Sequence, residues 1–319
     1  MSELVLILPV ASAGARAALA SPLARARESR LAAGDWRTWL AQRLGVEALA
    51  QRPPAQVAAA AVGVAAEGAW FATPVALVAA LDHVRMHATG WLTLTEGEAC
   101  ELAARFASVF EGSGLALSPA GAEGFLLSGL AADPVRTHDP AHLLAADIGP
   151  WLAAGEGAAA LRRLGTEIEM WLHEHPVNRA RARRGVAPVS TLWLWGGGES
   201  LCVATQTAAP RKPARAGLPR AYGSDSWLRG LWQAAGRPID GDAEALAQVQ
   251  MTPHADTVVV ARCGVDEDVA GRWCDPALAH LAARRIKAVQ LVIDDRLFRF
   301  SRFDLVKPWR RTVSWAAPA

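Results

Sequence analysis

Residues 167–198 contain the densest combination of side chains and backbone that binds small anions. Asn178 and Arg179 begin a segment rich in guanidinium groups. Arg183 lies four residues after Arg179, so the two would share a face if the segment is helical. Arginine binds carboxylate or phosphate in a bidentate manner, and a glycine backbone lets an anion approach closely. The candidate anion site therefore comprises Asn178, Arg179, Arg183, Gly196, Gly197 and Gly198. A solvated basic turn followed by a glycine-rich loop explains the same pattern.

Histidines and acidic residues offer weaker candidates for a metal site. His83 and His87 have the i, i+4 spacing of ligands on one helix face, and His173 and His175 are separated by one residue. Histidines so spaced on a polar helix face are usually solvated. The acidic run 266–268 follows an apolar strand, where α/β sheets place ligands, but an acidic helix start explains it better. We therefore expect no metal and no cofactor.

The motifs of common nucleophilic and nucleotide-binding sites are missing. The sequence has no G-x-S-x-G elbow, no Walker A loop and no G-x-G-x-x-G after a strand. Ser200 and Cys202 follow the triple glycine without an identifiable partner base. Together with Cys100, Cys263 and Cys274, Cys202 belongs to a widely spaced set without a C-x-x-C pair. This usage is typical of reduced thiols in a cytoplasmic protein.

Composition excludes several classes of protein. The chain has 319 residues, of which 52% are hydrophobic and 20% charged, so it contains enough apolar material for a sizeable core. Its 33 basic and 31 acidic residues leave a net charge of +2, which gives no global attraction to nucleic acid or to an anionic membrane. The Trp and Arg residues at 309–315 are interpreted as a structural cation–π cluster rather than a base-stacking surface.

The first half of the chain alternates apolar strands with helices. The continuous apolar run 4–10 predicts a buried strand of a parallel sheet, and it is too short to span a bilayer. An Ala-, Leu- and Arg-rich helical stretch follows. We then expect a strand near 56–64 and a helix near 75–87, because Thr73-Pro74 is a good helix start.

The second half continues this alternation. Thr95 and Glu98 form a capping box that predicts a helix, and apolar residues at helical spacing predict another before His175. Ser224 is expected to cap a further helix. The run 256–263 predicts an apolar strand, and a hairpin is predicted to turn at Asp294-Asp295. Strands that alternate with helices indicate an α/β fold.

The block from His175 to Gly198 resembles the signature that ends the inserted domain of archaeal-type, cofactor-independent phosphoglycerate mutases. The resemblance is carried by the His-Pro-Val-Asn run, the arginines after it, and the Leu-Trp-Leu-Trp-Gly-Gly-Gly run. A bacterial family, some of whose members are described as regulatory, shares this layout, and the resemblance spans roughly residues 90–240. It implies an alkaline-phosphatase-like α/β core sheet with helices on both faces, formed by residues 1–90 and 190–319. An inserted α+β domain, residues 91–189, would interrupt it.

This sequence departs from the mutases at the residues on which their chemistry depends. The resemblance implies two divalent metals held by Asp and His, with a Ser or Thr nucleophile. Here the first strand ends in Pro9 and Val10 with no acid following, and Ala261 and Arg262 stand where a ligand His is expected. We therefore expect a catalytically degenerate protein that binds a small anionic metabolite or a partner protein in a regulatory role. The alternative is an active phosphomutase- or phosphatase-like enzyme acting on phosphorylated or carboxylated small molecules.

Overall fold

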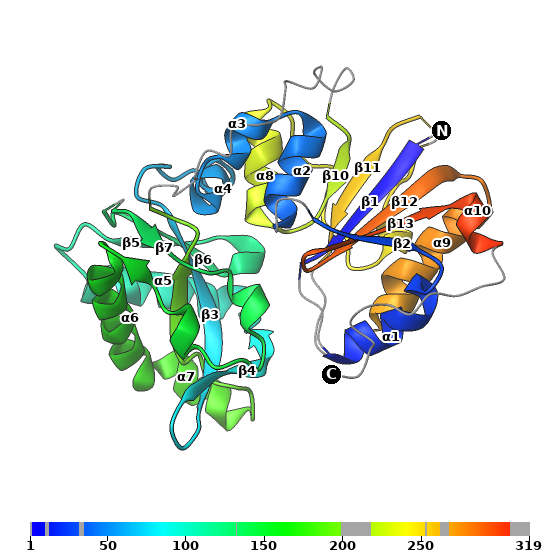
Figure 1. Cartoon of the computed structure of the whole chain (residues 1–319). Coiled ribbons are helices and arrows are strands. Elements are labelled where there is room, and N and C mark those ends of the chain that lie inside the picture. The colour runs from blue at the N-terminus through cyan, green and yellow to red at the C-terminus, as the bar shows by residue number, and fades with distance from the viewer. Residues whose placement is uncertain are drawn as a thin grey trace. The chain divides into compact units, whose positions relative to one another are not determined.

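The chain forms two compact units, each with its own sheet (Figure 1). Unit 1 comprises Met1–Glu47, Pro210–Ser224 and Arg237–Ala319, and unit 2 comprises Ala48–Ala209 and Asp225–Gly236. None of the helices in the described residues is both long and apolar enough to cross a membrane. The computed structural model describes residues 2–9, 13–31, 35–131, 133–198, 218–252, 254–261 and 268–306.

The sheet of unit 1 is built around the apolar strand that opens the chain. β1 (Ser2–Leu8) lies between β11 (Thr257–Val260) and β12 (Ile286–Ile293) and runs parallel to both. Both of its faces are buried, as its continuous apolar run predicts. β12 turns back through Asp294-Asp295, which confirms the predicted hairpin. The remaining strands are β10 (Arg220–Tyr222), parallel to β11, and the antiparallel β13 (Arg296–Ser301) and β2 (Arg27–Arg30).

Helices cover both faces of this sheet, which confirms the predicted α/β class. α1 (Ala13–Leu23) and α9 (Asp275–Ala282) share a hydrophobic core with Leu4 and Leu6 of β1. Glu3 points to the opposite face, because side chains alternate along a strand, and its Oε2 lies 2.5 Å from Nη2 of Arg43. Arg43 belongs to α2 (Trp36–Leu44). The other helical segments are α3 (Glu47–Ala50) at the unit junction, α10 (Arg302–Leu305), the 3₁₀ turn Leu246–Gln248 and the π-helix Ala270–Cys274.

The sheet of unit 2 is antiparallel and is centred on β3 (Trp70–Ala79). Along one side of β3 lie β4 (Val84–Trp91) and β6 (Phe125–Ser128), and along the other lies β9 (Thr191–Trp195). β5 (Ala116–Pro119) extends the sheet beyond β6, and a separate pair joins β7 (Val135–Arg136) to β8 (Ala154–Gly155). Among the described strands, β9 pairs with β3 alone and therefore forms an edge of the sheet.

Amphipathic helices bury one face of this second sheet. Leu102 and Phe106 of α5 (Glu96–Val109), with Leu161 and Ile168 of α6 (Ala158–His173), pack into a core with side chains of β3, β6 and β9. The predicted helices at these positions are thereby confirmed. Gly230 lets α8 (Ser226–Ala234) pass closely over α4 (Pro54–Val62), because a Cβ there would lie 2.0 Å from the Val57 carbonyl. The other helical segments are α7 (Pro176–Arg183) and the 3₁₀ turns Gly121–Glu123, Pro140–Leu143 and Gly149–Trp151.

Two predicted elements between residues 54 and 91 are wrong in type. The expected strand near 56–64 is the helix α4, since its alanines favour a helix. The expected helix near 75–87 is the hairpin of β3 and β4, in which Pro74 lies in register with Leu192 of β9. The predicted cap Ser224 is also wrong: Asp225 caps α8 by accepting a hydrogen bond from the Leu228 amide.

The unit junctions differ from those expected from the sequence. The sequence placed them at 90 and 189, whereas the compact units change at 47, 209, 224 and 236. Strand pairing is the reason: β3 and β4 precede residue 91 but share a sheet with β6 and, through β3, with β9. The segment Asp225–Gly236, which contains α8, also belongs to unit 2.

A buried ion pair fastens α7 to the start of α5. The Arg181 side chain is 2% exposed, and its Nη1 lies 3.0 Å from Oε2 of Glu98. Its Nε also donates to the Ala187 carbonyl at 2.8 Å. Glu98 completes the predicted capping box with Thr95 and contacts Arg184 as well. Partial burial opposes ionisation of Glu98, but the Thr95 amide, Arg181 and Arg184 together hold the pKa of its carboxyl below the ordinary value.

We expect Glu98→Gln to destabilise the protein by about 3 kcal/mol at pH 7, because it leaves the buried Arg181 charge uncompensated. The stabilising contribution of Glu98 is complete above its unfolded pKa of 4.5 and is lost as pH falls through the lower folded pKa. Urea denaturation should therefore show the difference between parent and variant shrinking below that pH. Glu101→Gln, which removes an exposed pair with Arg105, is the control and should change little. An equal loss at pH 3 and pH 7 would contradict this prediction.

Candidate functional site

The Asn178 side chain joins the end of α6 to the segment before β9 through hydrogen bonds. Its side-chain amide donates to the carbonyls of Leu172 and Val189, each at 2.8 Å, and its Oδ1 accepts from the Val189 amide at 2.8 Å. The residue is 7% exposed. Both donor hydrogens of the amide are therefore used within the protein, and we assign Asn178 a structural role rather than the predicted anion contact.

The triple glycine packs against its own sheet. A Cβ on Gly197 would lie 2.4 Å from Cδ2 of Trp70, and Gly196 and Gly198 adopt positive φ angles of 69° and 81°. The Gly196 amide donates to Oγ1 of Thr137 at 3.1 Å. The glycines thus permit a close approach, as predicted, but the group that approaches in this structure is β3.

The predicted residues fall into two separate groups. Asn178 and Arg179 lie near the beginning of β9, and the glycines lie after its end. The five residues of β9 alone span about 17 Å. The structure therefore does not bring the six predicted residues around one anion.

A cavity of about 550 Å³, here named the α7 cavity, lies within unit 2 beside Arg179. The guanidinium-bearing side chain of Arg179 is exposed, and within the described residues no acid lies within ion-pairing distance of it. Ser190 also lines the cavity, and its Oγ accepts a hydrogen bond from the Leu77 amide at 2.9 Å, which leaves the hydroxyl hydrogen available. The lining residues are Leu77, Ala79, Val84, Glu169, His173, Asn178, Arg179, Ala182, Pro188, Val189 and Ser190.

Arg183 differs from Arg179 although both belong to α7. It does not line the α7 cavity, and its Nε donates to the Arg179 carbonyl at 3.3 Å. His175 also lies outside the lining. It caps α7 by accepting the Val177 amide on Nδ1 at 3.2 Å. Burial and the nearby charge of Arg105 lower the pKa of His175, so its ring is neutral at pH 7.

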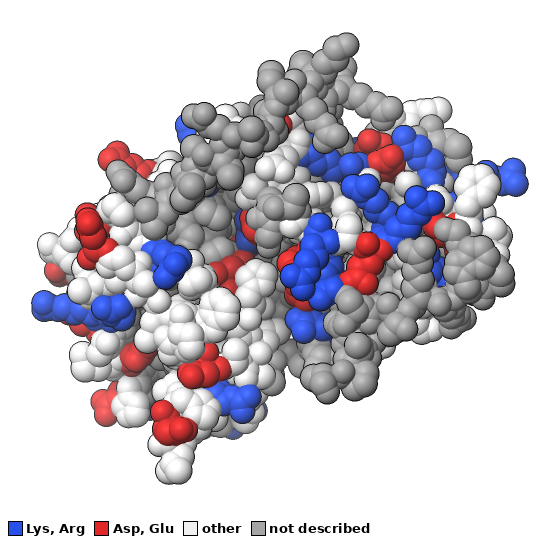
Figure 2. Space-filling view, in the orientation of Figure 1, with Lys and Arg blue, Asp and Glu red and all other residues white. Residues whose placement is uncertain are grey.

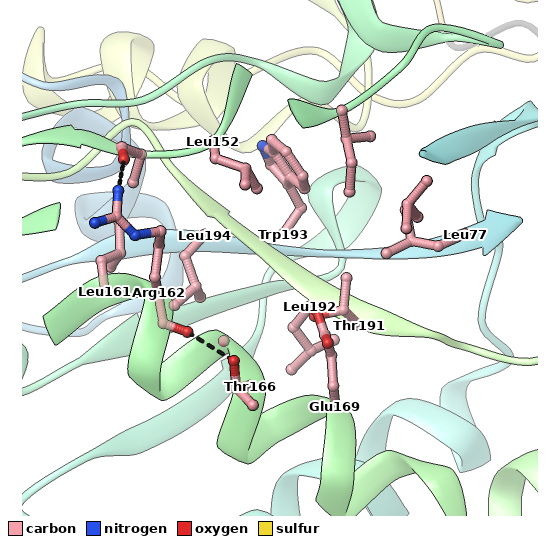
Figure 3. A pocket seen from close by; sticks show the side chains of 14 residues that line it. Leu77, Leu152, Leu161, Arg162, Thr166, Glu169, Thr191, Leu192, Trp193 and Leu194 are labelled. Carbon is pink, nitrogen blue, oxygen red and sulfur yellow. Dashed lines mark hydrogen bonds between the residues drawn. The ribbon is translucent and has the colours of Figure 1, made fainter. Parts of the chain in front are cut away.

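A second cavity of about 340 Å³, here named the α6 cavity, lies along β9 and shares Leu77, Val84 and Glu169 with the first (Figure 3). Its walls are mostly aliphatic, with Trp193 among them. Glu169 and Thr191 lie side by side at this wall. Glu169 is exposed, and partial burial of its carboxyl raises its pKa more than a hydrogen bond from Thr191 lowers it. The lining residues are Leu77, Val84, Ile148, Leu152, Ala153, Leu161, Arg162, Gly165, Thr166, Glu169, Thr191, Leu192, Trp193 and Leu194.

The predicted metal candidates do not converge. His83 and His87 are on a hairpin rather than a helix, so their spacing separates them by about 13 Å along the chain. His173 is exposed at the end of α6 whereas His175 is buried. Within the described residues, no group of three or more His, Cys, Asp or Glu is placed to hold a metal ion. Outside the described residues lie Asp266, Glu267, Ser200, Cys202, Cys263 and the run 309–315.

At the carboxyl end of the parallel strands in unit 1, the acid that follows β12 is paired. Oδ2 of Asp294 lies 2.9 Å from Nη2 of Arg16 in α1. Figure 2 shows basic side chains interleaved with acidic ones on the visible face of unit 1. Arg296 of β13, for example, contacts Glu28 of β2. Arginine in this unit is thus extensively engaged with the protein's own carboxylates.

Sequence reasoning missed Arg181 and Glu169. Arg181 is one of several arginines in a basic run, and the charge pattern gives no sign that this side chain turns inward. Glu169 lies beside the apolar stripe that predicts α6, and this position is the signal that the sequence offers. The cavity that makes Glu169 a candidate depends on β9 and on residues 148–153, which the helix pattern does not reveal.

We expect Gly197→Ala to destabilise the protein by about 1–3 kcal/mol, because the added methyl would overlap the Trp70 ring and the Ala69 carbonyl. Gly97→Ala is the matched control. A Cβ at Gly97 meets nothing within 4 Å, so alanine in the first turn of α5 should be neutral or stabilising. Denaturant midpoints measure both effects. An undiminished midpoint for Gly197→Ala would mean that the triple glycine is open enough to receive a ligand.

Comparisons with known proteins give similarities at low sequence identity. No family model matches the sequence, and a search of curated proteins finds no match. The cofactor-independent phosphoglycerate mutase from Thermoplasma acidophilum is 14% identical, with 94% of this chain and 90% of that chain covered and a TM-score of 0.34. A protein from Pyrococcus horikoshii is 13% identical, with 94% of this chain and 87% of that chain covered and a TM-score of 0.43.

Proposed function

We propose that this protein binds a small anionic metabolite in the α7 cavity and acts as a regulatory binding protein rather than as a phosphomutase. The observation that carries the proposal is the position of Arg179, an exposed guanidinium at a cavity of about 550 Å³ with no acid paired to it among the described residues. A cavity of this size accommodates small metabolites. Of the predicted anion contacts, this one remains free to act on a ligand.

The neighbours of Arg179 favour a small anion of limited charge. Ser190 has a hydroxyl hydrogen available, and the exposed ring of His173 adds a second nitrogen-bearing side chain to the lining. A guanidinium and a hydroxyl are suited to a carboxylate or phosphate group. Glu169 repels anions at its own end of the lining, so the anion is expected to bind at the Arg179 end.

The sequence supports a binding role without inherited phosphoryl-transfer chemistry. The mutases that the chain resembles are expected to hold two metals, and Pro9, Val10, Ala261 and Arg262 stand where the resemblance implies ligands or their neighbours. The pairing of Asp294 with Arg16 further engages the carboxylate that follows β12. An alkaline-phosphatase-like ancestry with lost metal ligands accounts for both the resemblance and these departures.

We expect 3-phosphoglycerate and inorganic phosphate to raise the melting temperature of the parent protein, because a ligand that binds only the folded state stabilises it by mass action. Arg179→Ala should abolish that increase while leaving the unliganded melting temperature nearly unchanged, since the side chain is exposed. Arg183→Ala is the matched control on the same helix and should keep the increase.

Two results would contradict the anion proposal. One is a parent protein that neither anion stabilises, which would favour a protein partner as the ligand. The other is an equal loss in Arg179→Ala and Arg183→Ala, which would indicate general attraction to a basic helix rather than a site.

We also expect the purified protein to contain no stoichiometric Mn or Zn and to lack phosphoglycerate mutase activity. Elemental analysis measures the metal, and a coupled assay of 3-phosphoglycerate conversion with and without added Mn²⁺ measures turnover. Chelation by EDTA should leave the melting temperature unchanged. About two equivalents of metal together with turnover would establish the active-enzyme alternative.

A further inference from the structure

The α6 cavity runs beside the free edge of β9. Four consecutive residues of this strand, from Thr191 to Leu194, line it. Because side chains alternate between the two faces of a strand, a cavity touching all four must lie along the strand's edge. The structure thus leaves one side of β9 facing a partly open space of about 340 Å³, within the size range of small-ligand sites.

This space suits a small molecule better than an added strand. The indole of Trp193 donates to the His138 carbonyl at 2.8 Å, and the Gly196 amide donates to Oγ1 of Thr137 at 3.1 Å. The segment 137–138 therefore already occupies the far end of β9. An added strand could therefore pair only with the part of the edge that lies beside the cavity.

The walls require a ligand with an apolar body. The lining is mainly aliphatic, with Trp193 as its aromatic member, and the side chains at its rim are unusually exposed. Leu152 is 42% exposed and Val84 is 38% exposed, and Leu81 at the tip of the neighbouring β3–β4 hairpin is completely exposed. An apolar ligand would cover part of this surface and gain the corresponding hydrophobic free energy.

The polar group of the lining selects the charge of that ligand. Glu169 is the one acid that lines the α6 cavity, and no cation of the described residues forms an ion pair with it. Arg162, the one base in the lining, instead donates to the Ala153 carbonyl at 2.6 Å, and Figure 3 shows its guanidinium turned away from Glu169. The Thr191 hydroxyl lies beside the carboxyl group of Glu169 (Figure 3). An ammonium group would complete this arrangement, because a charge-assisted hydrogen bond to a carboxylate is among the strongest polar contacts.

We propose that the α6 cavity binds a primary amine with an aromatic or branched aliphatic body, its ammonium group on Glu169 and its apolar part against Leu152, Leu161 and Trp193. This site is distinct from the guanidinium of Arg179. It stands whether or not the α7 cavity binds an anion, although the two cavities adjoin at Glu169.

Titration calorimetry with phenylethylamine at pH 7.5 tests the proposal, with 2-phenylethanol and 3-phenylpropionate as neutral and anionic probes of similar shape. The amine should bind, and the alcohol should bind at least about tenfold more weakly. In the Arg179→Ala variant, which lacks the proposed anion contact, the carboxylate should not bind measurably. Glu169→Gln should reduce amine affinity to that of the alcohol. Glu174→Gln, an exposed acid at the end of the same helix and outside the lining, should leave amine affinity unchanged.

Gly165→Leu provides a test that does not depend on charge. Gly165 lines the cavity from α6, and a Cβ there meets nothing within 4 Å, so leucine can enter the open space while improving helix propensity. This variant should fold at least as well as the parent and lose amine binding, while any stabilisation by phosphate at Arg179 persists. The proposal is overturned if the amine binds no better than the alcohol, or if Gly165→Leu binds the amine as the parent does.

Discussion

The pairing of β9 with β3 is the interaction on which unit 2 depends. It joins residues 71–75 to residues 191–195 in antiparallel register, and a stacked Phe71–Trp195 ring pair reinforces it. Asn178 fixes the chain just before β9, and the glycines let the chain pass Trp70 just after it. Asn178 and the glycines, which the sequence predicts to bind an anion, therefore position this strand instead.

The same pairing creates the candidate sites. Among the described strands β9 pairs with β3 alone, so it forms an edge, and its outer side faces α6 and residues 148–153. Arg181 and Glu98 hold α7 in place, so that Arg179 on that helix remains at the α7 cavity. The buried Arg181–Glu98 pair thus determines the position of the Arg179 guanidinium, although the pair itself does not line the cavity.

The sequence predicted those parts of the fold that local patterns determine. β1, α5 with its capping box, α6 and the β12–β13 hairpin follow from apolar periodicity or turn chemistry. Between residues 54 and 91 the alanine-rich apolar pattern suits strand and helix alike, and the outcome depends on partners far along the chain. The unit junctions could not be predicted for the same reason, since β3 gains its neighbour β9 more than one hundred residues later.

The candidate site shows the same division between chemistry and environment. Residue types correctly indicated that Asn178 and the glycines form close polar or backbone contacts, but the contacting groups belong to the protein itself. Arg179 and Arg181 are two residues apart with the same side chain, yet one is exposed at a cavity and the other is buried against Glu98. Two positions along a helix turn the side chain to a different side, so Arg179 and Arg181 differ in environment although they are the same residue type.

The position of β1 has a consequence for biosynthesis. Its two sheet neighbours, β11 and β12, begin at residues 257 and 286, so both leave the ribosome long after β1 does. At translation speeds of about 5–20 residues per second, the delay is on the order of tens of seconds. During that interval a nascent strand of continuous apolar residues lacks its final neighbours, while β3 and β9 of unit 2 have already been synthesised. Vectorial synthesis therefore favours early folding of the internal unit and makes the N-terminal strand a natural target for chaperones.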